Sequence, residues 1–229
     1  WVRAADRKAR AVVLKRSRAW TDAGSQGYEL MLDEGRLAWS LIHFWPGNAA
    51  SVRTRAELPL ARWVEVAVTH DGSGRAAGLR IFLDGAPAEV ETVRDGLWKP
   101  ITGGDPGGLT LAERFRDAGF AGGAVDELRV FDRARAPLEV ALLHPGGAVA
   151  IATDEAPLYE AWLAAVDEPA RAARENLRSA RRARAEQLDG VEEIMAMEEM
   201  PEPRPAFVLT RGRYDAPDPA RPVRAHPPT

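Results

Sequence analysis

From residue 1 to about residue 134, the chain alternates apolar and polar positions in short runs separated by Gly, Pro, Asn and Asp. Two of these runs, 26–32 and 37–41, each place three apolar side chains on one face. They flank the turn at residues 33–35. Alternation with a period of two predicts half-buried β-strands, and the short turn predicts that the two strands form a hairpin.

The same alternation predicts further strands along this part of the chain. They are expected at 11–14, 51–56, 63–70, 79–83, 109–111 and 124–131. Short strands that recur roughly every 8–12 residues, with turn residues between them, are typical of an all-β sandwich. The pattern therefore predicts a mainly β fold for the first part of the chain.

After residues 145–147, the apolar spacing changes from strand-like to helical. Leu158, Trp162 and Val166 share one face of a predicted helix that ends before Glu168-Pro169. A second helix is predicted over residues 171–188, because Asp189-Gly190 follows it.

From residue 191 the pattern is extended, and residues 215–229 are Pro-rich and expected to be poorly ordered. We divide the chain into a sandwich at 1–144, a helical connector at 145–190 and the beginning of a following domain at 191–229.

Composition and charge exclude several classes of protein. Among the 229 residues 45% are hydrophobic and 28% charged, which is normal for a globular protein. The formal net charge of −3 argues against a general nucleic-acid binder. The absence of cysteine excludes disulfides, thiolate zinc sites and cysteine nucleophiles within these residues. No apolar run approaches the roughly 18 residues that a membrane span needs.

Three segments carry a resemblance to a known fold family. They are WVEVAVTHDG at 63–72, IFLDG at 81–85 and GGAVDELRVFDRA at 122–134. Together they resemble the last third of a laminin-G-like, concanavalin-A-type jelly roll. The resemblance implies a jelly-roll sandwich that binds a ligand rather than transforming one.

A second set of motifs resembles a more specific group of proteins. HFWPGNA at 43–49, RFRDAGF at 114–120, MAMEE at 195–199, Pro203-Arg204 and Arg211-Gly212 are similar to motifs of planctomycete multidomain proteins that contain a cytochrome c module. The resemblance implies an exported parent protein, located in the periplasm or at the cell surface, of which this chain is a piece. It places haem c in another part of the parent, with no cofactor except a candidate calcium ion here. It also implies that the first strand of the sandwich is missing, which would expose a strand edge.

The loop at 43–49 is the first candidate site. Trp45 stands before Pro46-Gly47, a turn that can hold an indole at the surface for stacking on a sugar. His43, Asn48 and Arg53 are the polar candidates, with Arg55 beside them. The alternative is that Phe44 and Trp45 close the end of the sandwich as core residues.

Arg114, Arg116 and Asp117 form a second candidate site for an anion or a glycan. A salt-bridge clamp that holds their loop onto the sheet explains these residues equally well. Asp126, Asp71 and Asp84 are candidate calcium ligands at the rim of the sandwich. Alternation points Asp126 inward, where the alternative role of its carboxylate is to accept backbone N–H groups.

No catalytic residue is predicted. Residues 193–198 are similar to the catalytic strand of laminarinase-type glycosidases, but Met195 replaces the assisting aspartate and the segment follows the predicted helices. The first hypothesis is therefore a non-catalytic recognition module for polysaccharide. The second is a structural module that packs against flanking domains of the same chain. An exposed Trp45 favours the first and a buried Trp45 favours the second.

Overall fold

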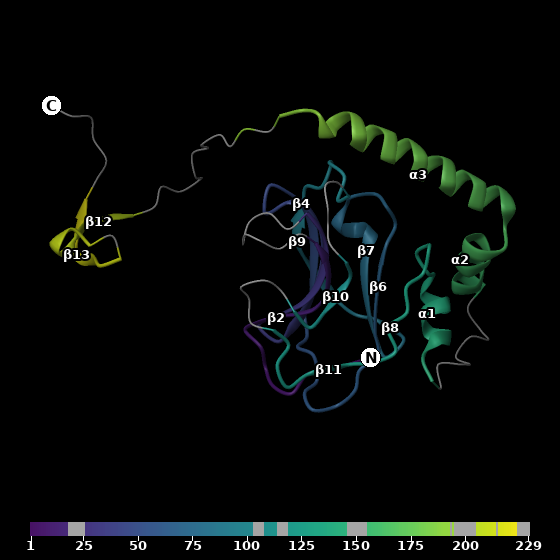
Figure 1. Cartoon of the computed structure of the whole chain (residues 1–229), viewed down its shortest axis with the longest axis horizontal. Helices are drawn as coiled ribbons and strands as arrows, with labels where there is room; N and C mark the ends of the chain where they lie inside the picture. Colours follow the sequence, from purple (N-terminus) through teal and green to yellow (C-terminus); the bar gives the residue numbers. More distant parts are fainter. Residues whose placement is uncertain are drawn as a thin grey trace. The chain divides into compact units, whose positions relative to one another are not determined.

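The computed structural model describes residues 1–17, 26–102, 108–113, 119–145, 155–192, 194, 205–213 and 215–223. These residues form two compact units, Trp1–Val191 and Glu192–Thr229. The first unit contains the β-sandwich and three α-helices, and the second contains a small β-hairpin. Figure 1 shows the chain coloured along its sequence, with labels on many of these elements.

The larger sheet of the sandwich has six strands in the order β10-β2-β3-β4-β5-β9. Every neighbouring pair is antiparallel. In chain order its strands are β2 (Arg10–Ser17), β3 (Gly27–Asp33), β4 (Arg36–Phe44), β5 (Asn48–Thr54), β9 (Val90–Asp95) and β10 (Thr110–Leu111).

The second layer is smaller. Three strands pair in the order β6-β7-β8: β6 (Val66–His70), β7 (Leu79–Leu83) and β8 (Ala86–Pro87). The short helix η1 (Ala76–Gly78) lies in the loop between β6 and β7. The short strands β1 (Val2–Arg3) and β11 (Ala124–Val125) pair with each other, and Val2 also bridges to Val64 just before β6.

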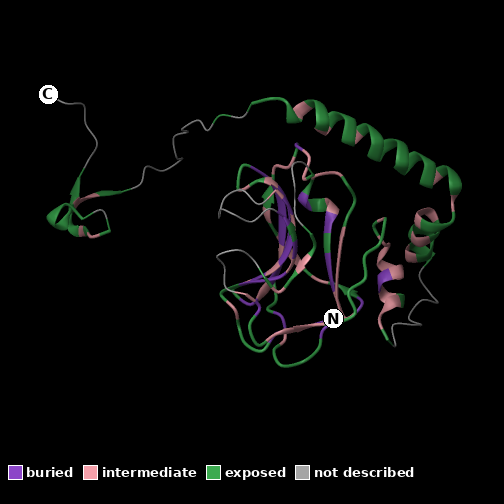
Figure 2. Cartoon of the chain, in the orientation of Figure 1, coloured by how far each residue is buried: buried purple, intermediate pink, exposed green. Residues whose placement is uncertain are grey.

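The core lies between the two layers, and the buried positions of Figure 2 lie mostly along their strands. It contains the alternating apolar residues of the predicted strands. They are Leu30, Leu32, Leu37, Trp39, Leu41, Val64, Leu79 and Ile81. The indole N–H of Trp39, from the larger sheet, donates to the carbonyl of Thr69 in β6 over 3.2 Å. This bond links the layers and satisfies the polar atom of a buried aromatic side chain.

The predicted hairpin is confirmed by β3 and β4, which pair from Gly27↔Ile42 to Asp33↔Arg36. The prediction of a strand over 124–131 is wrong beyond Val125, where β11 ends. Glu127 has a φ of 49°, which turns the backbone out of the strand direction. Leu128 and Val130 are then 42% and 75% exposed. The edge strand β9 was not predicted, because its sequence Val-Glu-Thr-Val-Arg-Asp does not alternate regularly.

The helices α1 (Pro137–Leu143), α2 (Glu155–Ala165) and α3 (Glu168–Asp189) follow the sandwich in sequence. Helix α1 contacts β8, and Val140 on α1 is 2% exposed. The Asp167 carboxylate caps α3 by accepting from the Ala170 N–H over 2.9 Å. Pro169 lies in the first turn of α3, where its missing N–H costs no helical hydrogen bond.

The second unit contains β12 (Ala206–Leu209) and β13 (Pro217–Val223), which pair antiparallel. The short helix η3 (Thr210–Gly212) lies in the loop between them. The expectation that residues from 215 onward lack order is therefore wrong for 217–223. The prolines of β13 remain compatible with a strand because a two-stranded ribbon leaves an outer edge without ladder bonds.

Candidate functional site

The tight turn between β4 and β5 carries the aromatic residues that the sequence singled out. Phe44 ends β4 and is 40% exposed, and Trp45, the first residue of the turn, is half-buried. The guanidinium of Arg94, on the neighbouring strand β9, lies 5.4 Å from the centre of the Trp45 ring. That distance is within the range of a cation–π interaction, which orients the indole from one side.

Asn48 fixes this turn to the loop that follows β9. Its side chain is fully buried, and its Oδ1 accepts from the backbone N–H groups of Trp98 (3.1 Å) and Lys99 (3.3 Å). A buried amide that accepts two backbone N–H groups holds the two loops in one geometry. Asn48 was predicted to contact a ligand, but its burial gives it a positioning role instead.

Trp98 is the aromatic residue that the sequence analysis missed. It is 42% exposed, and its ring approaches Gly96, which in turn lies close to the carbonyl of Gly47 in the β4–β5 turn. The signal was present in the sequence, since Trp98 stands in a short loop between Gly96 and Pro100. Phe44, Trp45 and Trp98 therefore lie on two linked loops at one end of the sandwich. We call these three residues the aromatic cluster.

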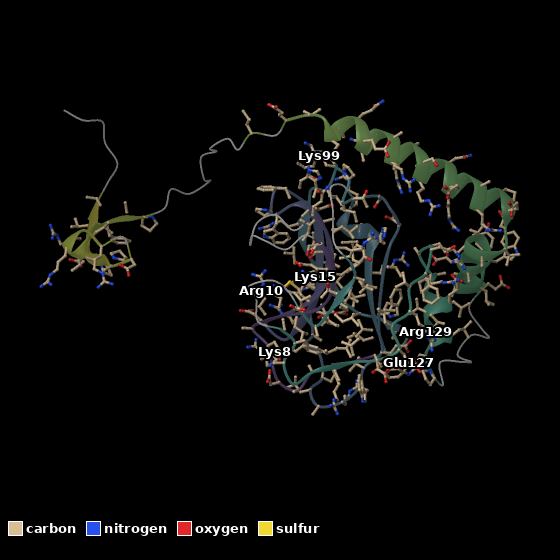
Figure 3. The ribbon with its side chains drawn as sticks, viewed as in Figure 1. Lys8, Arg10, Lys15, Lys99, Glu127 and Arg129 are labelled. Carbon is tan, nitrogen blue, oxygen red and sulfur yellow. The ribbon has the colours of Figure 1, made fainter. Side chains whose placement is uncertain are left out.

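His43 is close to the aromatic cluster but is already engaged. Its Nδ1 lies 2.7 Å from the carbonyl of Pro100 and 3.8 Å from the carboxylate of Asp189 at the end of α3. Lys99, labelled in Figure 3, donates from its ammonium group to the carbonyl of Val191. These contacts place the end of α3 and the residue after its cap beside the loop that carries Trp98.

Arg53 lies away from the aromatic cluster. It is five residues along β5 from Asn48, a distance of about 17 Å in a strand. Its guanidinium binds Glu91 over 2.6 Å and Asp33 over 2.5 Å. The hydrogen bond to Glu91 raises the pKa of Arg53, and the same bond lowers the pKa of Glu91. Arg53 therefore belongs to a charged network across the strands rather than to the loop site.

The second predicted site, Arg114, Arg116 and Asp117, lies outside the described residues. For calcium, the structure does not bring the three predicted aspartates together. Asp71 follows β6 and Asp84 follows β7, so antiparallel pairing places them at opposite ends of the β6–β7 pair. No group of three His, Asp or Glu side chains within the described parts of the chain is arranged to hold a metal ion.

Each of these aspartates accepts from a nearby backbone N–H group. Asp71 accepts from Ser73 and Asp84 accepts from Glu65, while Asp126 accepts from Glu127 over 2.8 Å. Asp126 was predicted to point inward, but it is exposed because the strand ends before it. The backbone-accepting role that was the alternative for Asp126 describes all three carboxylates.

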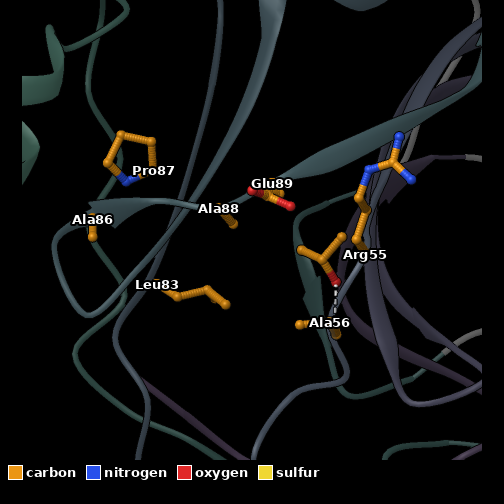
Figure 4. Close-up of a pocket in the computed structure, with 8 residues that line it drawn as sticks. Arg55, Ala56, Leu83, Ala86, Pro87, Ala88 and Glu89 are labelled. Carbon is orange, nitrogen blue, oxygen red and sulfur yellow. Dashed lines mark hydrogen bonds between the residues drawn. The ribbon is translucent and has the colours of Figure 1, made fainter.

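A separate hollow of about 370 Å³ lies near the other end of β5 (Figure 4). It is lined by residues 54–56, Leu83 and residues 86–89, and Arg55 and Glu89 are its charged members. The Thr54 hydroxyl in its wall donates to the carbonyl of Ala56 over 2.7 Å. The aromatic cluster does not contribute to this hollow, whose lining is mainly apolar.

Comparison with protein families agrees with the sandwich just described. Residues 1–141 match the family model for laminin-G-like domains of the concanavalin A-like lectin/glucanase superfamily. The chain belongs to this superfamily. A comparison with curated proteins finds no match. Laminin-G-like domains are in general binding modules without catalytic activity. Among the described helices, none is long and apolar enough to cross a membrane.

Proposed function

We propose that the sandwich is a non-catalytic recognition module that binds polysaccharide through the aromatic cluster. The observation that carries the proposal is the presence of Phe44, Trp45 and Trp98 on two loops joined by the buried amide of Asn48. Aromatic faces stack on the C–H surfaces of sugars, and burying such rings contributes most of the energy of a contact of this kind. Arg94 supplies a cation beside the Trp45 ring for hydroxyl or acidic groups of the ligand.

The partly exposed aromatic side chains support binding over a purely structural role. Two of the three rings are about 40% exposed at the end of the sandwich, where a core residue would be covered. Trp45 itself is half-buried, so its position alone does not separate the two hypotheses. The proposal extends to an exported parent at the cell surface or in the periplasm. The resemblance of residues 43–49, 114–120 and 195–199 to motifs of planctomycete proteins that contain cytochrome c motivates this extension.

The first experiment is a glycan-array screen of the chain, with Trp98→Ala and Trp45→Ala as site variants and Trp162→Ala as the matched control. Trp162 lies on α2 and is 44% exposed, so its loss removes a similar indole outside the site. We expect Trp98→Ala to weaken retention at least tenfold, which is about 1.4 kcal/mol. Trp162→Ala should bind like the parent chain.

The screen is run with calcium and with a chelator. Retention that survives chelation and is lost in Trp98→Ala supports stacking at the aromatic cluster. Retention that disappears on chelation contradicts a mechanism based on stacking alone. If a folded sample binds no glycan on the array, the result favours the second hypothesis, in which the sandwich packs against flanking domains.

A further inference from the structure

The hollow of Figure 4 lies between the end of β5 and the hairpin of β7 and β8. Its volume of about 370 Å³ is at the low end of the range for ligand pockets, which favours a small ligand. The chemistry of that ligand is indicated by the apolar part of the lining and by the two charged residues, Arg55 and Glu89.

The apolar part of the lining offers a surface to an aliphatic group. Leu83 and Ala88 pack against the core but are only partly buried, and Ala86 and Pro87 on β8 are exposed. The N–H of Ala88 already donates to the carbonyl of Ile81 over 2.9 Å. An aliphatic group that covered these residues would remove apolar surface from water without leaving this N–H unbonded.

Arg55 and Glu89 lie beside each other where the pairing of β5 and β9 is continued. The N–H of Arg55 donates to the carbonyl of Glu89 over 2.9 Å. Two residues away on each chain segment, the directly opposite residues Arg53 and Glu91 form an ion pair of 2.6 Å. Arg55 and Glu89 form no such pair: within the described parts of the chain, neither side chain has a hydrogen bond or an ion pair. The hollow therefore has a cation and an anion at adjacent positions that do not bind each other.

This combination matches the chemistry of a free amino acid, which has an ammonium group and a carboxylate on one carbon atom. Opposite residues of an antiparallel pair have Cβ atoms about 5 Å apart, so the two charged side chains can reach the groups of one α-carbon. In the view of Figure 4 the Glu89 carboxylate lies between Ala88 and the Arg55 side chain. Charge-assisted hydrogen bonds to both groups would fix the ligand with its side chain on the apolar lining.

We propose that the hollow binds a free α-amino acid with an aliphatic side chain. The carboxylate of Glu89 accepts from the ammonium group, the guanidinium of Arg55 donates to the carboxylate, and the aliphatic chain covers Leu83, Ala86 and Ala88. Because both charged partners are exposed and the ligand is small, we expect a Kd on the order of 1 mM. The site does not depend on the proposed polysaccharide site, since the aromatic cluster contributes no residue to the hollow.

The test is an NMR titration of the isotope-labelled full chain with L-leucine, at concentrations well above the expected Kd. The amide signals of Ala86, Ala88 and Glu89 should shift and reach saturation. Three analogues each lack one group of leucine: isocaproate lacks the ammonium group, isoamylamine lacks the carboxylate, and glycine lacks the aliphatic chain. Each should bind at least about tenfold more weakly than leucine.

Variants separate the two charged contacts. Glu89→Gln should weaken the binding of leucine and isoamylamine about tenfold and leave isocaproate unchanged, whereas Arg55→Gln should weaken leucine and isocaproate and leave isoamylamine unchanged. Arg80→Gln is the matched control, because Arg80 is exposed on β7 and does not line the hollow. Ala86→Trp fills the hollow and should abolish leucine binding.

The absence of shifts at residues 86–89 with leucine would overturn the proposal. Equal binding of leucine, isocaproate and isoamylamine would also overturn it, because apolar contact alone would then account for binding. Undiminished leucine binding in folded Ala86→Trp would contradict the hollow as the site. Trp98→Ala should bind leucine like the parent chain, so the outcome of this titration is separate from that of the glycan screen, and a loss there would contradict the assignment to the hollow.

Discussion

Glu139 anchors the N-terminus of α1, and neutralising it tests how much its bonds to the preceding segment contribute to stability. One carboxylate oxygen accepts from Arg133 over 2.5 Å and from Arg135 over 3.1 Å. The other accepts from Arg133 and from the backbone N–H of Ala136, over 2.8 Å each. The bonds from Arg133 are the main cause that lowers the pKa of Glu139 from 4.5 to about 2.

The size of the effect follows from the pKa. A change from 4.5 to about 2 corresponds to at most about 3 kcal/mol of interaction with the ionised form. The Glu139 side chain is 18% exposed, so solvent screens the contact only in part. Because Gln keeps some of the hydrogen bonds, we expect Glu139→Gln to lower the free energy of unfolding by about 1–3 kcal/mol at pH 7.

The pH dependence of the difference gives an independent check. The folded-state pKa of Glu139 lies below its unfolded value, so its contribution is complete above about pH 4.5 and is lost as the pH falls towards 2. The difference between the parent chain and Glu139→Gln should therefore shrink over that range. Other carboxyl groups titrate there as well, but they are common to both proteins and cancel in the difference.

Urea unfolding followed by tryptophan fluorescence is the suitable assay. All seven tryptophans lie between residues 1 and 162, so the signal reports the first unit and not the second. Glu160→Gln is the matched control, since Glu160 is exposed on α2. A loss below about 0.5 kcal/mol for Glu139→Gln, or a difference that does not change with pH, would refute the reasoning.

Three further predictions concern the fold and the sites. Gly27→Ala should destabilise the sandwich by about 2 kcal/mol or more in urea unfolding. The backbone φ of Gly27 is +139°, and the new Cβ would lie 2.0 Å from the Arg16 carbonyl oxygen. An unchanged free energy of unfolding would contradict this geometry. Asn48→Ala should cost about 1–3 kcal/mol of stability and also weaken glycan retention, since two buried N–H groups lose their acceptor; unchanged retention would show that the loops do not need this link. A chelator should leave the Tm unchanged, because the carboxylates of Asp71 and Asp84 bind backbone N–H groups, and a drop in Tm would reveal a metal.

The sandwich could be predicted where local pattern and pairing agree. The hairpin of β3 and β4 has regular alternation on both strands and a turn at Glu34-Gly35 between them. The residue pairing between the two strands can therefore be predicted from the sequence. The segment after Val125 has the same alternation but forms no strand. A strand needs a neighbour on at least one side, and alternation within one segment says nothing about whether that neighbour is present.

The candidate site was predicted only in part, because its geometry depends on contacts between distant loops. Trp45 was found from the turn that follows it, whereas Trp98 joins it through Asn48, fifty residues away in sequence. The burial of Asn48 has no local signal, since an asparagine beside a turn is usually exposed. The positions of Asp71 and Asp84 could have been predicted, because an antiparallel pair of strands separates the residues that follow each strand.

The buried amide of Asn48 has a consequence for how this surface can diversify. The two loops are held by backbone bonds to one internal side chain, and the aromatic rings at their tips take no part in those bonds. Exchanging Phe44 or Trp98 for another residue keeps both bonds to Asn48, because their donors are backbone N–H groups. On the proposed function, a library made at these two positions would change ligand preference while the link through Asn48 stays in place. Residues 44 and 98 can therefore vary in this surface, while Asn48 must stay the same.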